Sequence, residues 1–123
     1  MTDTSQPVLV QARDRKLYIT LNRPEVLNAQ NQPLREDLVG AIERLEADPD
    51  LLVGIIYGAG GRAFSAGADL KEVRSPSGSR RPLPEQHDRK WVHFEAVRWA
   101  SKPIIAATCV LNGLLSFENR TSR

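Results

Sequence analysis

Cysteine, aromatic residues and net charge are all scarce in this sequence, and each scarcity argues against a class of protein. The single cysteine, Cys109, leaves no internal disulfide possible, and its apolar neighbours favour a buried side chain over a catalytic thiol. The formal net charge of +2 is too small to indicate a nucleic-acid partner. The basic segment 74–90 has no aromatic residues to stack on bases, so we interpret it as a solvated surface loop.

Long apolar runs are also missing. No window is apolar enough to cross a bilayer, and the first residues, MTDTSQPVLVQARD, lack the charged start and apolar stretch of a signal peptide. We therefore expect no membrane association and a cytoplasmic location, and we expect no metal site. The 41% hydrophobic and 26% charged content is typical of a globular chain, and 123 residues suffice for one small domain.

The apolar pattern of the first half predicts a hairpin followed by a helix. Two runs, 8–12 and 16–21, are split by Arg13-Asp14-Arg15, and the second alternates as a strand does. Apolar residues then recur at helical spacing from Pro33, a residue suited to a first helical turn. Asp48-Pro49 ends this helix, because proline disfavours a helical residue before it.

The second half predicts two further strands and a helix. Segment 51–58 is almost wholly apolar, which predicts a strand buried on both faces within a helix-covered sheet. Residues 85–100 predict a helix with Val92, Ala96 and Trp99 on one side, and 102–111 is a third β-type run. The order of elements indicates an α/β fold.

A glycine-rich turn follows the predicted strand 51–58. Gly58–Ala63 formally satisfies G-x-G-x-x-[GA], the pattern of dinucleotide-binding turns. However, Gly67 interrupts the helix that should open in the motif, and Arg80 and Arg81 stand about twenty positions on, where an acidic residue is expected. A Rossmann-like nucleotide-binding fragment is therefore only an alternative interpretation.

A longer pattern carries a more specific resemblance. LNRPEVLNA, the predicted helix, GIIYGAGGRAFSAGADLKEV and KPIIAA follow one another between Leu17 and Ala107, and AFSAGADLK is the most distinctive part. This string resembles the crotonase superfamily of enoyl-CoA hydratases and isomerases. The resemblance implies the N-terminal part of a crotonase-like (ClpP/crotonase) spiral of ββα units. It divides the chain into a disordered N-terminus 1–7, a truncated crotonase-like domain 8–110 and a divergent tail 111–123.

The resemblance also implies a chemistry. The family binds acyl-CoA thioesters and stabilises an enolate-like oxyanion with two backbone N–H donors, and losing one such donor costs roughly 3–4 kcal/mol. Ala68 matches the first donor, and Gly67 would give its turn conformational freedom. Asp69 is a good helix N-cap, which we prefer to a catalytic role. Coenzyme A enters as part of the substrate, and no separate cofactor is implied.

Other residues match positions around the bound substrate. Arg62 and Lys71 match basic positions near the CoA phosphates, although both could be plain surface charges. Two short segments match the walls of the CoA channel, where Val26 and Leu70 could equally be packing residues: Val26, Leu27, Ala29, Ala66, Gly67, Ala68, Asp69 and Leu70. Ser65 has no base placed to activate it, and neither histidine, His87 or His93, is assigned to catalysis.

The pattern breaks after KPIIAA. The family continues to a glycine-rich turn with the second donor and then to catalytic glutamates. Here Asn112-Gly113 is at most a shifted partial match to that turn, and Glu118 has no matching position. We therefore expect this truncated chain to be inactive alone, although complete members are lyases and isomerases that form trimers or hexamers. The alternatives are a non-catalytic CoA-binding or interaction module and the Rossmann-like fragment. Fold resemblance does not choose among the family's reactions.

Overall fold

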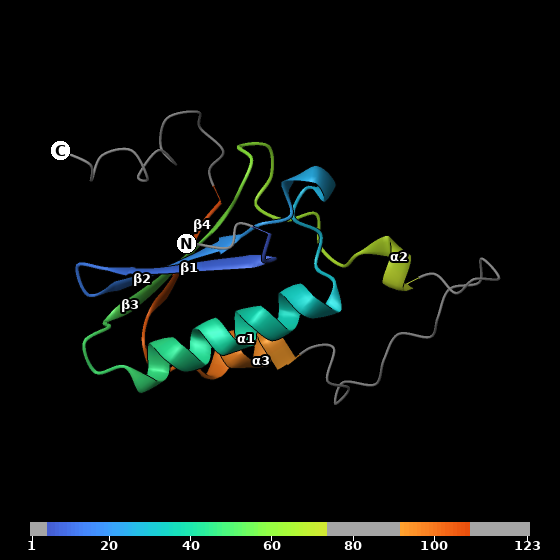
Figure 1. Cartoon of the computed structure of the whole chain (residues 1–123). Helices are drawn as coiled ribbons and strands as arrows, with labels where there is room; N and C mark the ends of the chain where they lie inside the picture. Colours follow the sequence, from blue (N-terminus) through green and yellow to red (C-terminus); the bar gives the residue numbers. More distant parts are fainter. Residues whose placement is uncertain (1–4, 74–91, 109–123) are drawn as a thin grey trace.

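The computed structural model describes residues 5–73 and 92–108, which form a four-stranded sheet with α1 and α3 on one side (Figure 1). The elements in chain order are β1 (Val8–Arg13), β2 (Lys16–Leu21), the 3-10 helix η1 (Pro24–Val26), α1 (Gln32–Ala47), β3 (Val53–Gly58), α2 (Leu70–Val73), α3 (Val92–Trp99) and β4 (Ile104–Ala107). The strand order is β1-β2-β3-β4, with β1 antiparallel to β2 and the other pairs parallel. The predicted α/β class is confirmed.

The predicted N-terminal hairpin is present. Arg13 pairs with Lys16 at its end. The two residues between them, Asp14 and Arg15, have φ angles of 50° and 63°. Positive φ at both central residues is typical of a type I′ turn, whose twist matches that of the flanking strands. The local sequence therefore fixes the register of the first strand pair.

Helix α1 is held at both ends by side chains. Asn31 is its N-cap, and its Oδ1 accepts a hydrogen bond from the Leu34 N–H at 3.1 Å. At the other end, Lys102 Nζ donates to the carbonyl oxygens of Leu45 and Asp48, each at 2.6 Å. The helix begins one residue earlier than predicted and ends where predicted.

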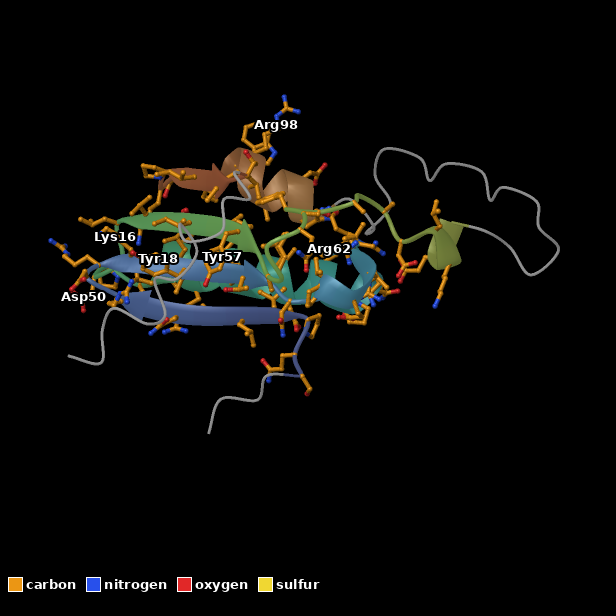
Figure 2. All side chains as sticks on the ribbon, turned by 90° about the horizontal axis from the view of Figure 1, so that it is seen from above. Lys16, Tyr18, Asp50, Tyr57, Arg62 and Arg98 are labelled. Atoms are coloured by element: carbon orange, nitrogen blue, oxygen red, sulfur yellow. The ribbon has the colours of Figure 1, made fainter. Side chains whose placement is uncertain are left out.

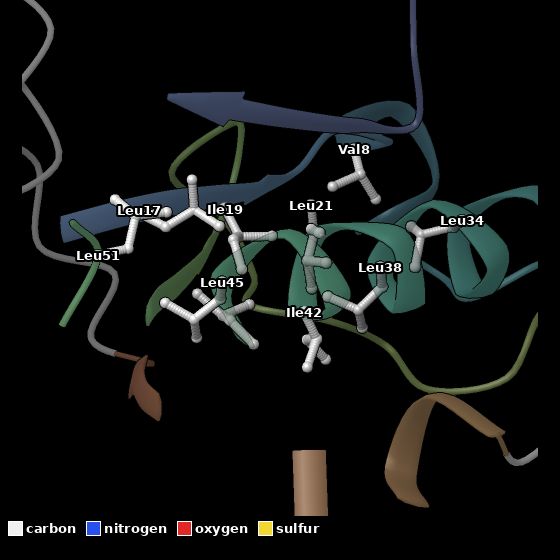
Figure 3. Close-up of a cluster of buried hydrophobic side chains, with 11 residues drawn as sticks. Val8, Leu17, Ile19, Leu21, Leu34, Leu38, Ile42, Leu45 and Leu51 are labelled. Carbon is white, nitrogen blue, oxygen red and sulfur yellow. The ribbon is translucent and has the colours of Figure 1, made fainter. Parts of the chain in front are cut away.

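The apolar core lies between α1 and the sheet (Figure 3). Leu17 of β2 and Leu34 and Leu45 of α1 are completely buried. Gly54 of β3 lets the helix approach closely, since a Cβ there would lie 2.9 Å from Leu45 Cδ2. The full core cluster is Val8, Leu17, Ile19, Leu21, Leu34, Leu38, Ala41, Ile42, Leu45, Leu51 and Ile56.

One expectation about β3 is wrong within the described residues. Its side chains were expected to be buried on both faces, but its burial alternates along the strand. Ile56 is buried against α1, whereas Ile55 and Tyr57 are only half-buried. Ile55 and Tyr57 lie on the face of the sheet that α1 and α3 do not cover. Figure 2 views this face, where Tyr18 and Tyr57 lie on neighbouring strands. Apolar content alone could not reveal this difference, because α1 and α3 both pack on the same side.

The second predicted helix is described from Val92, and residues 85–91 lie outside the described residues. Its buried side runs through His93, Ala96 and Ala100. Trp99 was expected to share the side of Ala96, but it is 76% exposed, and the Arg98 guanidinium lies 5.5 Å from its ring centroid. That prediction is wrong because the buried stripe runs from His93 to Ala96 and Ala100, three and seven residues further along the chain.

Several predictions concern residues that the structure does not describe. These are Cys109, His87, the basic segment 74–90, and the tail 111–123. Bilayer-spanning helices are not found among the described residues, whose helices are too short or too polar for that role. Groups of side chains suited to hold a metal ion are likewise not found among them.

Candidate functional site

The glycine-rich turn 58–69 leaves the carboxyl end of β3 and runs beside the segment that follows β2 (Figure 1). Because β2 and β3 are parallel, both segments emerge at the same edge of the sheet, where α/β proteins bind their ligands. Hydrogen bonds join them. Ala66 N–H donates to Leu27 O at 2.9 Å, Gln30 N–H donates to Gly67 O at 2.7 Å, and Asp69 N–H donates to Gln30 O at 3.0 Å.

These bonds determine the direction of the Ala68 N–H. Ala68 and Gln30 form an isolated parallel bridge, in which the bonds to Gln30 pass through the flanking residues Gly67 and Asp69. The N–H of Ala68 therefore points away from Gln30. Ala68 is exposed, and no hydrogen bond within the described part of the chain uses its N–H. The turn thus holds an exposed backbone donor in a fixed direction.

Gly67 supplies the backbone conformation of this turn. Its φ is +89°, and a Cβ at this position would meet nothing within 4 Å. The requirement for glycine is therefore conformational and not steric, because side-chain-bearing residues rarely adopt this region. The expectation that Gly67 provides conformational freedom is confirmed.

Asn28 connects the segment that follows β2 with the turn 58–69. It is completely buried, and both Leu27 and Asn28 are left-handed, with φ angles of 54° and 56°. Its Oδ1 accepts from the Arg23 N–H at 2.9 Å, and its Nδ2 donates to Ala59 O and Ala63 O at 3.0 Å each. Asparagine is one of the few residues that tolerates a left-handed backbone, and here its amide nitrogen and its amide oxygen are both hydrogen-bonded.

The hydroxyl of Ser65 is committed to the same network. It donates to Asn28 O at 2.8 Å and accepts from the Gly67 N–H at 3.1 Å. Gln30 Nε2 also lies 3.5 Å from it. This arrangement agrees with the expectation that Ser65 is not a nucleophile, because its proton and lone pairs support the turn.

Asp69 joins the turn to α2 and to Arg23. Its Oδ1 accepts from the Lys71 N–H at 3.0 Å, which confirms the predicted capping role. Its Oδ2 pairs with Arg23 Nη1 at 3.1 Å, and the same nitrogen donates to Ala29 O at 2.6 Å. The Lys71 N–H and then the Arg23 guanidinium hold the pKa of Asp69 below its usual range.

Two further contacts secure the neighbourhood. Glu72 of α2 accepts from the Gln32 N–H at 2.7 Å and pairs with Arg35 at 2.8 Å, so it ties α2 to the start of α1. His93 of α3 is buried, and its Nε2 lies 3.0 Å from Gln30 Oε1. His93 therefore supports segment 27–30, whose Gln30 is bridged to Ala68.

The structure brings most of the predicted site residues into this region. Ala29 is buried, and Val26, Leu27, Gly67 and Asp69 are partly buried. The remaining predicted residues are exposed: Arg62, Ala66, Ala68, Leu70 and Lys71. Arg62 lies beyond the Tyr57 end of the sheet (Figure 2). Sequence reasoning gave Arg23, Gln30 and Glu72 no role, and it included Asn28 only within segment 26–29 of the CoA channel. For Asn28 the available signal was an asparagine in an irregular, proline-containing segment.

The dinucleotide-binding interpretation loses its structural support. The stretch Gly58–Ala63 is an irregular turn in which Gly60 and Gly61 have φ angles of 91° and 66°. The next helix, α2, begins only at Leu70. A dinucleotide turn would open directly into a helix whose N-terminus receives the pyrophosphate.

Comparison with known proteins identifies the family. Residues 14–113 match the sequence profile of enoyl-CoA hydratase/isomerase. The chain belongs to this family. Its fold is similar to part of the crystal structure of enoyl-CoA hydratase from Mycobacterium tuberculosis, with a TM-score of 0.65 and 37% identity over 84% of this chain and 38% of that one. The predicted crotonase-like fold is thereby confirmed.

Curated relatives of this family member act on different CoA esters, by their names. It is 34% identical to mitochondrial 3-hydroxyisobutyryl-CoA hydrolase of Rattus norvegicus, over 85% of this chain and 27% of that protein. It is 36% identical to mevalonyl-coenzyme A hydratase of Beauveria bassiana, over 93% of this chain and 44% of that protein. The chain thus spans less than half the length of these relatives, which agrees with the predicted N-terminal portion.

Proposed function

We propose that this chain binds an acyl-CoA thioester and presents the Ala68 N–H to the thioester carbonyl oxygen, as one donor of an oxyanion hole. The observation that carries this proposal is the open Ala68 N–H, which points away from Gln30 in a turn fixed on both sides. Negative charge on the carbonyl oxygen is stabilised most by donors that are already oriented before the reaction. Membership of the enoyl-CoA hydratase/isomerase family supports the choice of substrate.

The remaining contacts follow from the chemistry of CoA. Its phosphates are anionic, so the exposed cations Arg62 and Lys71 are suited to bind them. Segments 26–29 and 66–70 would form the walls beside the pantetheine arm, with the exposed Leu70 as an apolar contact. The CoA moiety belongs to the substrate, and the proposal needs no separate cofactor. A cytoplasmic location stays a prediction, and one relative is named as mitochondrial.

We further propose that the chain alone does not turn over its ligand. The donor needs an acid or base beside it, and the carboxylate of the adjacent residue, Asp69, is bound to Arg23 and to the Lys71 N–H. With its pKa lowered, Asp69 is a weak base. Ser65 is equally occupied within the turn. The second donor and the acid–base groups are therefore not assigned to any residue that the structure describes.

Calorimetry with CoA and butyryl-CoA tests the proposal. The wild-type chain should bind butyryl-CoA about 2- to 12-fold more tightly than CoA, which corresponds to one neutral hydrogen bond to the thioester. Ala68→Pro removes the N–H and should abolish this preference, whereas the control Ala68→Ser keeps the N–H and the preference. A wild-type chain that binds neither ligand would contradict the proposal. Turnover of a short 2-enoyl-CoA would contradict the predicted inactivity.

A non-catalytic CoA-binding module remains the second candidate. The exposed Arg62 and Lys71 favour it, because they would bind CoA without any contact to the thioester. The same calorimetry separates the two. Equal affinity for CoA and butyryl-CoA in the wild-type chain and in Ala68→Pro would support the module, and a preference that depends on the Ala68 N–H would support the oxyanion hole.

A further inference from the structure

The direction of the Ala68 N–H is set by its neighbours. Its own side chain is a methyl group on the surface and cannot fix the backbone. Neighbouring residues fix the backbone instead, because the Ala66 N–H donates to Leu27 O and the Asp69 N–H donates to Gln30 O. A change in the path of segment 27–30 would therefore rotate the Ala68 N–H. The orientation of this N–H thus depends on the contacts that fix segment 27–30.

The path of segment 27–30 depends on Asn28. Two consecutive residues, Leu27 and Asn28, adopt the left-handed region, which most side-chain-bearing residues avoid. The Asn28 N–H donates to Arg23 O at 2.8 Å, and its Oδ1 accepts from the Arg23 N–H at 2.9 Å. Backbone and side chain thus close one small ring with Arg23, which fixes the start of the segment.

The same side chain also anchors the facing turn. Asn28 Nδ2 donates to the carbonyl oxygens of Ala59 and Ala63, and Asn28 O accepts from the Ser65 hydroxyl. A Cβ on Gly58 would lie 2.7 Å from Nδ2, so the amide sits directly against the turn backbone. One buried residue therefore fixes both of the segments whose pairing aims the Ala68 N–H.

We propose that Asn28 is the positioning residue for the Ala68 N–H, an inference that rests on the proposed function. Asn28 lies under the turn and is completely buried, so it acts on the ligand only through the backbone. Its loss should weaken the contact to the thioester carbonyl. Contacts to the CoA phosphates are common to CoA and butyryl-CoA, so they cancel in the ratio of the two affinities.

The decisive variant is Asn28→Gly, which retains access to the left-handed backbone and removes the amide. The butyryl-CoA preference should fall from about 2- to 12-fold in the wild type to about onefold in the variant. If Asn28 had a purely structural role, its loss would weaken the binding of both ligands equally and leave the ratio of their affinities unchanged. That result would overturn the inference.

Ser65→Ala provides a second route if Asn28→Gly does not fold. It removes the hydroxyl that joins Asn28 O to the Gly67 N–H, and it should lower the same ratio. The matched control Ser65→Thr keeps a hydroxyl and should restore the wild-type ratio. An unchanged ratio in Ser65→Ala would overturn the inference.

Hydrogen exchange without ligand separates this inference from the proposed function. If the wild-type chain shows no preference for butyryl-CoA, the oxyanion proposal fails, and exchange then decides the role of Asn28. The amide protons of Ala66 and Asp69 should exchange about tenfold faster in Asn28→Gly, relative to that of Ile56 in β3, because their hydrogen bonds open more often. Equal acceleration at all three positions, or none, would overturn the positioning role.

Discussion

The core between α1 and the sheet and the turn 58–69 are stabilised by different forces. The core contains completely buried aliphatic residues such as Leu17 and Leu45. The turn is held by the completely buried Asn28 of the facing segment 27–30 and by hydrogen bonds from Ser65, Asp69 and the backbone. The two regions adjoin at the carboxyl ends of β2 and β3.

The difference corresponds to what each region does. Hydrophobic burial scales with area and has no direction, so it can stabilise a sheet without aiming any particular atom. Hydrogen bonds weaken steeply when they are misaligned, so a network of them fixes orientation. The strength of a hydrogen bond from an exposed N–H such as that of Ala68 depends on the direction of that N–H more than on the stability of the fold. Substitutions in the two regions should therefore produce different signatures.

Leu45→Ala should have the largest effect on stability. Its side chain is completely buried against Gly54, and shortening it leaves a cavity that costs about 2–5 kcal/mol. The matched control is Leu52→Ala, since Leu52 is 52% exposed and its truncation should change stability by less than about 0.5 kcal/mol. Urea unfolding followed by circular dichroism measures both. Equal losses would contradict the packing in Figure 3.

A pair of glycine substitutions tests the turn against the helix. Neither Gly67 nor Gly40 has an atom within 4 Å of a built Cβ, so neither replacement causes a clash. Gly67→Ala should destabilise by about 1–2 kcal/mol because the residue is left-handed. Gly40→Ala should stabilise by about 0.5–1 kcal/mol because Gly40 lies within α1. Unfolding free energies of the same sign would contradict the conformational role of Gly67.

The periodic parts of this fold were predictable, and the layered parts were not. The stripe from Leu34 to Leu45 predicted α1 because one face of a helix repeats in sequence. The half-open face of β3 was missed, since a strand's own residues do not reveal which layers cover it. Trp99 was placed on the wrong side of α3 because an eight-residue helix allows more than one apolar stripe.

The candidate site divides in the same way. Ala68 and Gly67 were found through a contiguous stretch that resembles a family. The residues that hold them were missed because their contacts are distant in sequence. Asn28 reaches Ala59 and Ala63, which lie 31 and 35 residues away, and Arg23 reaches Asp69 across 46 residues. Such pairs leave no period in the sequence, and only the folded chain brings them together.

Among the substitutions in the turn, Asp69→Asn should have the smallest effect on stability, and its pH dependence shows whether charge contributes to the turn. The Lys71 N–H and Arg23 keep the pKa of Asp69 below its ordinary value of 3.8. A carboxyl whose pKa is lower in the folded state adds stability above its unfolded pKa and loses it as the pH falls through the folded pKa. The amide can still cap α2, so at pH 7 the substitution should cost only a few tenths to about 1 kcal/mol. Urea midpoints of wild type and Asp69→Asn should therefore converge as the pH falls below 3.8. A difference in midpoint that stays constant with pH would mean that the turn is held by hydrogen-bond geometry alone. The turn would then differ from the core in having directional contacts, and the charge of Asp69 would add nothing to that difference.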